Sequence, residues 1–178
     1  MAAPKPLRID PIAEAKRQWV AHGWEDSAAG MAAVTSVMRA HQLMLARVDE
    51  VLRPIGLSFA RYELLALLAF TREGVLPMSS ATARLQVHPT SVVNTVDRLQ
   101  ADGLVERRRH PSDGRAVLLE LQPAGRDLVA RATDALNAAV FSAPGLAADD
   151  TDALVAIIAR MRRDAGDFAD PRPQPDPL

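Results

Sequence analysis

Cysteine is absent from the 178-residue sequence, which excludes disulfides, thiolate metal ligands and a cysteine nucleophile. Aromatic residues are scarce, at 4%, and no apolar run approaches the ~20 residues that a membrane-spanning helix needs. Residues 1–11 are polar and contain prolines, so they do not resemble a secretion signal. Together with 48% hydrophobic and 24% charged residues, these absences predict a cytoplasmic globular protein that does not bind membranes.

An excess of charge is also lacking, because 21 basic and 22 acidic residues give a formal net charge of -1. This balance excludes a protein-wide basic field, so any nucleic-acid site has to be local. The charges are unevenly placed along the chain. Residues 105–115 contain four arginines against Glu106 and Asp113, whereas residues 149–178 contain seven aspartates against four arginines. Near neutrality is therefore the average of a basic segment and an acidic end.

Motifs for catalysis are missing as well. The histidines, at positions 22, 41, 88 and 110, do not have metal-ligand spacing. No glycine-rich phosphate loop and no Ser-His-Asp motif occurs. We therefore expect no enzyme activity, no catalytic residues, no cofactor and no metal.

Apolar residues recur at intervals of three and four along most of the chain, a pattern that predicts helices. The predicted helices cover residues 9–24, 26–53, 58–72, 79–85, 89–103, 124–142 and 149–168. Expected caps are Asp10, Ser58, and either Asp149 or Asp150. Residues 104–110 and 116–121 read as two strands around a turn at Pro111–Gly114. The predicted fold class is mainly α (α+β).

The helix predicted after Pro89 has a polar outer face. Its inward positions are apolar: Val92, Val93, Val96 and Leu99. Its outward positions carry short polar side chains and one arginine: Thr90, Ser91, Asn94, Thr95 and Arg98. Asparagine pairs with adenine, arginine pairs with guanine, and hydroxyls reach phosphates or base edges. Helix capping explains the Thr/Ser cluster equally well when this face is considered alone.

The predicted hairpin favours the DNA interpretation. Arg107, Arg108 and Arg109 precede its turn and Arg115 follows it. A charge run is commonly only solvated, but next to a polar recognition face it suits a wing. Arg115 would then enter the minor groove, oriented by Asp113, while the other arginines, Arg107 and Arg109 among them, hold phosphates. Residues 79–121 thus have the layout of a winged helix-turn-helix.

Four short segments and three single residues carry a family resemblance. They are Val87-His88-Pro89-Thr90-Ser91-Val92, then Val96-Asp97-Arg98-Leu99 with Asp102-Gly103-Leu104-Val105, and the wing Asp113-Gly114-Arg115 with Leu121, Gly125 and Arg126. With these residues the chain resembles the MarR family of transcriptional regulators over about residues 31–161. The resemblance implies a homodimer with two winged lobes that read a pseudopalindromic operator in double-stranded DNA. It also implies a repressor that a small-molecule effector releases from DNA.

The predicted domains follow from this organisation. Residues 1–25 form an N-terminal extension, 56–121 the DNA-binding lobe, and 169–178 a disordered tail. Residues 26–55 and 122–168 form a helical dimerisation domain, because their apolar seams exceed what one small lobe covers. A monomeric helical bundle is the alternative. The candidate dimer residues are Met31, Val34, Met38, Leu45, Leu136, Val140, Leu154 and Ile158.

Candidate effector residues come from helices expected to converge between the lobe and the dimer domain. They are Trp24, Arg39, His41, Arg61 and Tyr62. Guanidinium groups, an imidazole and aromatic walls suit a small anion, and we favour an organic acid such as aconitate or citrate. The alternatives are a packed interface histidine at position 41, a solvated Arg39 and a packing role for Trp24.

Two other functions remain open at this stage. The N-terminal helix with its tryptophan resembles a urate-sensing branch of the family, in which an acid is paired with an arginine two turns later; here Glu63 fits but Phe70 does not. The other alternative is a winged helix that binds proteins and has lost DNA binding. Its affinity for duplex DNA would not fall steeply with salt. Titration of His41 or His88 would add pH dependence to DNA binding.

Overall fold

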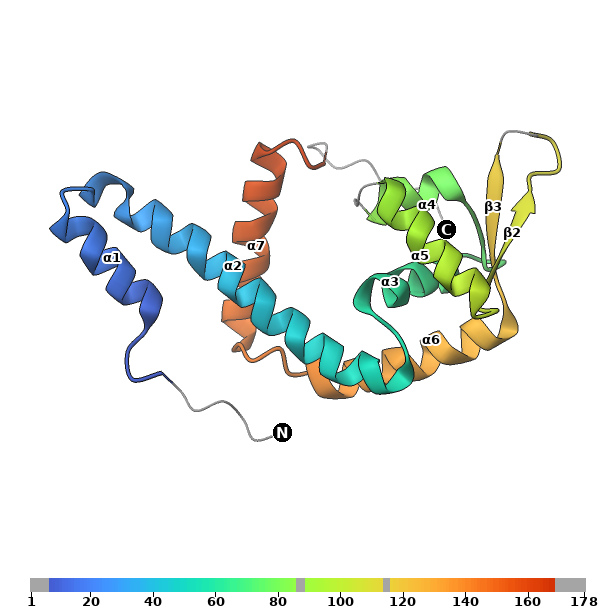
Figure 1. The fold of residues 1–178 in the computed structure, drawn as a ribbon, viewed down its shortest axis with the longest axis horizontal. Coiled ribbons are helices and arrows are strands. Elements are labelled where there is room, and N and C mark those ends of the chain that lie inside the picture. Colours follow the sequence, from blue (N-terminus) through green and yellow to red (C-terminus); the bar gives the residue numbers. More distant parts are fainter. Residues whose placement is uncertain (1–6, 86–88, 114–115, 169–178) are drawn as a thin grey trace. The chain divides into compact units, whose positions relative to one another are not determined.

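The computed structural model describes residues 7–85, 89–113 and 116–168 (Figure 1). The chain divides into two compact units, residues 1–47 and 48–178, and the division falls inside a long helix. The described residues are mostly helical, with one small antiparallel sheet. This composition confirms the predicted mainly-α class. The predicted tail at 169–178 lies outside the described residues.

The first unit consists of two helices. α1 spans Pro11–Ala21, and the side chain of Asp10 caps it by accepting a hydrogen bond from the Ile12 amide at 2.9 Å. Gly23 has a φ of 78° and separates α1 from α2, which spans Glu25–Leu52 and continues into the second unit. Three of the four ends of α1 and α2 lie within two residues of the predicted ends, and α1 ends three residues earlier than predicted.

The second unit begins at Val48, in the last turns of α2, and the chain turns a corner after that helix. A short 3-10 turn, η1 at Arg53–Ile55, ends at Gly56, whose φ of 80° permits the reversal of the chain. α3 spans Phe59–Ala69 and is capped by Ser58, as predicted. It ends earlier than the predicted residue 72, and Phe70 is its C-terminal cap.

The helix-turn-helix is formed by α4, Met78–Leu85, and α5, Pro89–Ala101. The sequence pattern of the helix at 79–85 predicts that Ala83 is buried, but in α4 the buried residue is Ala81 and Ala83 is exposed, so this prediction is wrong. In α5 Val93 is 41% exposed, which corrects its predicted inward position. The spacing explains this, because Val92, Val96 and Leu99 share one face and leave Val93 about 100° around the helix. The break predicted at 86–88 lies outside the described residues.

The sheet contains three strands in the order β1-β3-β2. β2 spans Val105–Arg109 and β3 spans Val117–Leu121, so the predicted hairpin is confirmed. The third strand, β1 at Val75–Pro77, pairs with β3 and is not predicted by the sequence pattern. A strand of 3 residues is too short to show an alternation of apolar and polar side chains, so the sequence pattern does not predict it.

The C-terminal helices follow the sheet directly. α6 spans Pro123–Leu136 and ends in a π-helical turn, η2 at Asn137–Phe141, which together match the predicted helix 124–142. A Cβ at Gly125 would collide with the carbonyl oxygen of Leu104, so glycine permits α6 to pack against the strand start. α7 spans Ala148–Asp164 and is capped by Ala147, not by Asp149 or Asp150. The two aspartates lie in its first turn, where their charge favours the helix dipole.

The core of the second unit is rich in leucine. Leu64, Leu65 and Leu68 of α3 are fully buried together with Leu99 of α5 and Leu119 of β3. The C-terminal end of α2 and the inner face of α6 join the same core. Leu136 and Val140, predicted to face a second subunit, are 0% and 8% exposed within the chain and therefore serve this core instead.

Candidate nucleic-acid interface

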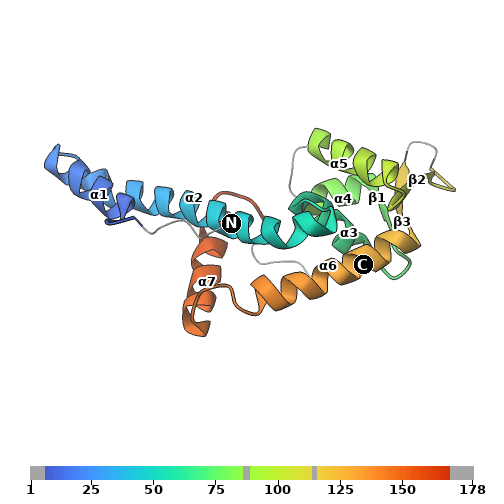
Figure 2. The same cartoon turned by 60° about the horizontal axis from the view of Figure 1, so that its bottom comes forward.

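α5 and the β2–β3 hairpin lie side by side in the second unit (Figures 1 and 2). α5 buries Val92, Val96 and Leu99 against the core. Of the residues predicted to face outward, Thr90, Ser91, Asn94 and Arg98 lie away from this buried face, and Thr95 lies at its edge. All of these are exposed except Thr95, which is half-buried and donates a hydrogen bond from its hydroxyl to the Ser91 carbonyl at 2.9 Å.

Two of the outward side chains keep their hydrogen-bonding groups unused. Within the described residues, neither the Asn94 amide nor the Arg98 guanidinium has a hydrogen-bond partner or an ion pair. They are four residues apart and therefore lie on the same face of α5. An amide and a guanidinium presented in this way have the donors and acceptors needed to read base edges.

The arginines of β2 divide between the two faces of the sheet, because successive side chains of a strand point to opposite sides. Arg107 and Arg109 share the face of the buried Val105. Arg108 lies on the other face, where its guanidinium donates a hydrogen bond to Glu120 at 2.6 Å and this contact raises the pKa of Arg108. Arg107 and Arg109, predicted to hold phosphates, thus lie on one face of the sheet, and Arg108 lies on the other.

Arg107 has a role that the sequence pattern does not reveal. Its guanidinium forms an ion pair with Asp97 at 2.6 Å and donates hydrogen bonds to Gln100 and to the Val93 carbonyl, at 3.0 and 3.5 Å. All three partners are on α5, so Arg107 fastens the wing to that helix. Arg109, in contrast, is exposed and has no such partner among the described residues. Arg109 is therefore the arginine of β2 that remains available to a phosphate.

The tip of the hairpin is described only in part. The His110 amide donates to the Ala116 carbonyl and the Ala116 amide to the Asp113 carbonyl, each at 3.1 Å, which closes the turn. Asp113 is exposed. Arg115, predicted to enter the minor groove, lies outside the described residues, and so does any contact between its side chain and Asp113.

The candidate effector residues fall into the two units. In the first, Trp24 is 52% exposed and stacks on His22 with ring centroids 5.5 Å apart. Arg39 donates a hydrogen bond to Gln42 at 3.2 Å, and His41 is exposed within the chain rather than buried. Position 41 falls among the apolar positions of the predicted helix 26–53, which predicts a buried or pocket-lining histidine. In the single chain this side chain is exposed.

Arg61 and Tyr62, in the second unit, are occupied by lobe contacts. The Arg61 guanidinium pairs with Asp102 and donates to the Gly56 carbonyl at 3.1 Å. The Tyr62 hydroxyl lies 3.1 Å from the Thr133 hydroxyl, and Tyr62 is 7% exposed. Arg61 thus joins two elements of the lobe, and Tyr62 joins α3 to α6.

A groove of about 210 Å³ between α3 and α6 contains residues that the sequence pattern does not single out for binding. Its lining is mainly apolar, with Phe70 70% exposed at one side. Arg126 also lines it, and within the described residues its guanidinium has no hydrogen-bond or ion-pair partner. The helix-period pattern gives no signal for this groove, because it depends on which residues of α3 face α6.

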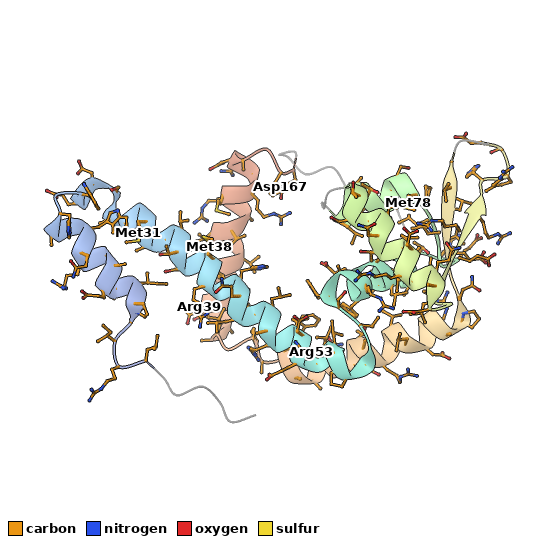
Figure 3. All side chains as sticks on the ribbon, viewed as in Figure 1. Met31, Met38, Arg39, Arg53, Met78 and Asp167 are labelled. Carbon is orange, nitrogen blue, oxygen red and sulfur yellow. The ribbon has the colours of Figure 1, made fainter. Side chains whose placement is uncertain are left out.

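Apolar side chains remain uncovered on α2 and α7. Val34 and Met38 of α2 are 60% and 61% exposed, and Leu45 is 36% exposed. Met31 and Met38 project from α2 in Figure 3. On α7, Leu154 and Ile158 line a hollow of about 510 Å³ together with Val155, Ala159, Arg162 and Phe168. These residues include six of the eight predicted dimer contacts, which the single chain leaves at least partly exposed.

Membrane and metal sites find no support in the described part of the chain. No helix there combines the length and apolar character required to span a membrane. Nor do three or more histidine, aspartate or glutamate side chains of these residues come together as a metal site.

Comparison with known proteins gives consistent matches. A family model described as the MarR family matches residues 55–116. The chain is similar to Sco5413, a MarR family transcriptional regulator from Streptomyces coelicolor, with 46% identity and a TM-score of 0.71. That similarity covers 80% of this chain and 99% of Sco5413. The chain is also similar to Sco3205, a MarR family regulator of the same organism in complex with DNA, at 25% identity and a TM-score of 0.66, covering 82% and 94% of the two chains.

A curated relative matches over a shorter region. The HTH-type transcriptional regulator ML2140 of Mycobacterium leprae is 34% identical over 76 residues, which are 43% of this chain and 50% of that protein. The chain thus spans about half the length of the curated relatives it matches first. The matched proteins are transcriptional regulators and not enzymes.

Proposed function

Because the chain belongs to the MarR family of transcriptional regulators, we propose that it is a homodimeric repressor that binds a pseudopalindromic operator and responds to a small anion. The observation that carries DNA binding is the pair of unused side chains, Asn94 and Arg98, on the outer face of α5 beside Arg109 of the wing. The DNA complex of Sco3205 supports the same use of this fold. Because such a regulator acts on the chromosome, we expect it in the cytoplasm.

We assign the residues of α5 and of the wing different contacts with DNA. Asn94 and Arg98 would read bases in the major groove, with Thr90, Ser91 and Thr95 at the phosphates or base edges. Arg109 would hold a phosphate, and Arg115 with Asp113 would act at the wing tip. Arg107 would act indirectly, since Asp97 and Gln100 occupy its guanidinium.

The test begins with selection of preferred sites from a pool of duplexes that carry a randomised segment of about two helical turns, the span of two half-sites. Selected duplexes should be pseudopalindromic, and binding should weaken steeply as salt rises. Asn94→Ala should bind the selected site more weakly and should relax the preference at the bases it contacts. If no duplex is enriched, or if affinity is insensitive to salt, DNA binding is refuted and the protein-interaction alternative is favoured.

Homodimer formation is supported by the uncovered apolar residues of α2 and α7. The interface we propose contains Met31, Val34, Met38 and Leu45 of α2, and Leu154 and Ile158 of α7. Leu136 and Val140 are left out of it, because the lobe core already buries them. We retain residues 26–55 and 122–168 as the dimerisation domain, although the inner face of α6 also belongs to the lobe core.

The anion response is supported by exposed basic and aromatic side chains of the first unit and by one guanidinium in a groove of the second. Trp24, Arg39 and His41 remain exposed candidates in the first unit, and Arg126 in the groove of the second adds an unused guanidinium. Arg61 and Tyr62 would contribute only if their lobe contacts opened. The test is thermal unfolding with citrate, aconitate or urate. Stabilisation that disappears in His41→Ala, or in Arg126→Gln but not in Arg131→Gln, identifies the responding site.

A further inference from the structure

The pair formed by Arg61 and Asp102 joins two helices of the second unit at ends that disfavour both charges. Arg61 is the third residue of α3, which begins after the cap Ser58. The amino end of a helix carries partial positive charge and favours acidic side chains there. Glutamate or glutamine is the usual choice at this position, because it completes a capping box. An arginine at this position is therefore locally unfavourable.

Asp102 has the opposite problem. It directly follows α5, whose end is closed by hydrogen bonds from the Leu104 amide to the Leu99 carbonyl and from the Gly103 amide to the Gln100 carbonyl. The carboxyl end of a helix carries partial negative charge and favours cations. A carboxylate there opposes the helix dipole. Each of the two charges is compensated by the other, across 41 residues of sequence.

Arg61 is also held by a third segment. Its guanidinium donates a hydrogen bond to the carbonyl of Gly56, the corner residue between α2 and α3, at 3.1 Å. The Arg61 side chain is only 16% exposed, whereas that of Asp102 is 52% exposed. Its Nε is buried and has no hydrogen-bond partner among the described residues. A buried donor without a partner carries a free-energy cost, so the remaining contacts of this side chain have to offset it.

We propose that Arg61 is a positioning residue for DNA recognition, which fixes the carboxyl end of α5 to the corner that follows α2. Asp102 is the point of attachment on α5, four residues after Arg98. Arg107 binds the same helix nearer its middle, through an ion pair with Asp97 and hydrogen bonds to Gln100 and the Val93 carbonyl. Two arginines outside α5 thus determine how the helix presents Asn94 and Arg98. This role rests on the proposed DNA binding.

The experiment uses the full chain and two changes that remove a charge, Arg61→Met and Asp102→Asn, alone and combined. Each single variant should lose operator affinity by on the order of tenfold, and the second change should add little to the first. The preference at bases read by Asn94 and Arg98 should relax, although neither residue is altered. The matched control is the pair Arg108→Met and Glu120→Gln, which removes an ion pair between β2 and β3 on the face of the sheet opposite Arg107.

Hydrogen exchange of the free protein separates this proposal from DNA binding itself. The amides of α5 near Ala101 should exchange faster in Arg61→Met and Asp102→Asn than in the parent, and those of α6 should not. The exchange of charges in Arg61→Asp/Asp102→Arg, which also suits both helix dipoles, should restore protection. Unchanged exchange in α5, or additive losses of affinity, would overturn the proposal. A parent that binds no duplex would instead refute the proposed function and leave the exchange result valid.

Discussion

The lobe and the helices α2 and α7 differ in how far their apolar side chains are buried. In the lobe, Leu65 and Leu68 of α3 are completely buried. On α2 and α7, Met38 and Val155 are 61% and 64% exposed. Burial of apolar surface contributes roughly 25 cal/mol per Å², so the lobe gains this term within the chain and the helices do not. The difference indicates that one region is held together by its own core, while the other requires a covering surface.

The largest expected effect is the loss of a buried lobe side chain. Leu68→Ala should lower the free energy of unfolding by about 3 kcal/mol, because it leaves a cavity in a closed core. Urea denaturation at two protein concentrations measures this, and the loss should be the same at both. Met38→Ala, at an exposed position of the proposed interface, should change stability only through dimer formation, and therefore with concentration. Equal losses for both variants at every concentration would contradict the distinction between the regions.

Charge on the uncovered helix face should separate the subunits. Met38→Asp would place a carboxylate in the proposed interface, where it has no partner among the residues we assign there, so the variant should sediment as a monomer. Ser36→Asp, an exposed position on another side of α2, is the control and should remain dimeric. A parent protein that sediments as a monomer at micromolar concentration would refute the two-lobe arrangement.

Periodicity is sufficient to predict most of the fold. The seams of α2 and α5, the cap Ser58 and the hairpin around Pro111 are all local patterns, and local patterns are visible in the sequence. Partners of charged residues are a different matter. The pairs Arg61–Asp102 and Arg107–Asp97 depend on how distant segments meet, and nothing in their spacing indicates them. The pattern misplaces Ala83 because α4 has only 8 residues from which to fix its inner face, and it misplaces Val93 because this valine lies beside the three buried positions of α5.

In the wing, Arg107 is held by contacts with α5, whereas Arg109 has no hydrogen-bond or ion-pair partner among the described residues. Arg109→Ala should weaken DNA binding similarly for all sequences and reduce the salt slope by about 0.9 for each phosphate that the variant no longer neutralises. Arg108→Ala, which removes the partner of Glu120 on the far face, should leave the slope unchanged. Titration of the selected duplex at several salt concentrations measures both. Equal slopes for the parent and Arg109→Ala would remove Arg109 from the interface.

Glu63 and Glu14 have carboxyls whose pKa values are shifted in opposite directions. On α3, burial raises the pKa of the Glu63 carboxyl. On α1, hydrogen bonds from Arg17 and Gln18 lower the pKa of Glu14 to about 2. A raised pKa means that the folded state binds the proton more tightly than the unfolded state, and a lowered pKa means the reverse. The two carboxyls should therefore affect stability with opposite dependence on pH.

Replacement of each glutamate by glutamine should make this opposition measurable. The contribution of Glu63 is present below its unfolded pKa and lost as pH rises through the folded pKa, so Glu63→Gln should be more stable than the parent at about pH 7. That advantage should disappear near about pH 4, where the unfolded carboxyl also takes up its proton. Glu14 contributes above its unfolded pKa, so Glu14→Gln should be slightly less stable than the parent at neutral pH, and salt should erase the difference because the pair is exposed. Urea denaturation of both variants across this pH range measures these changes, and a parallel response would mean that Glu63 gains a partner in the dimer.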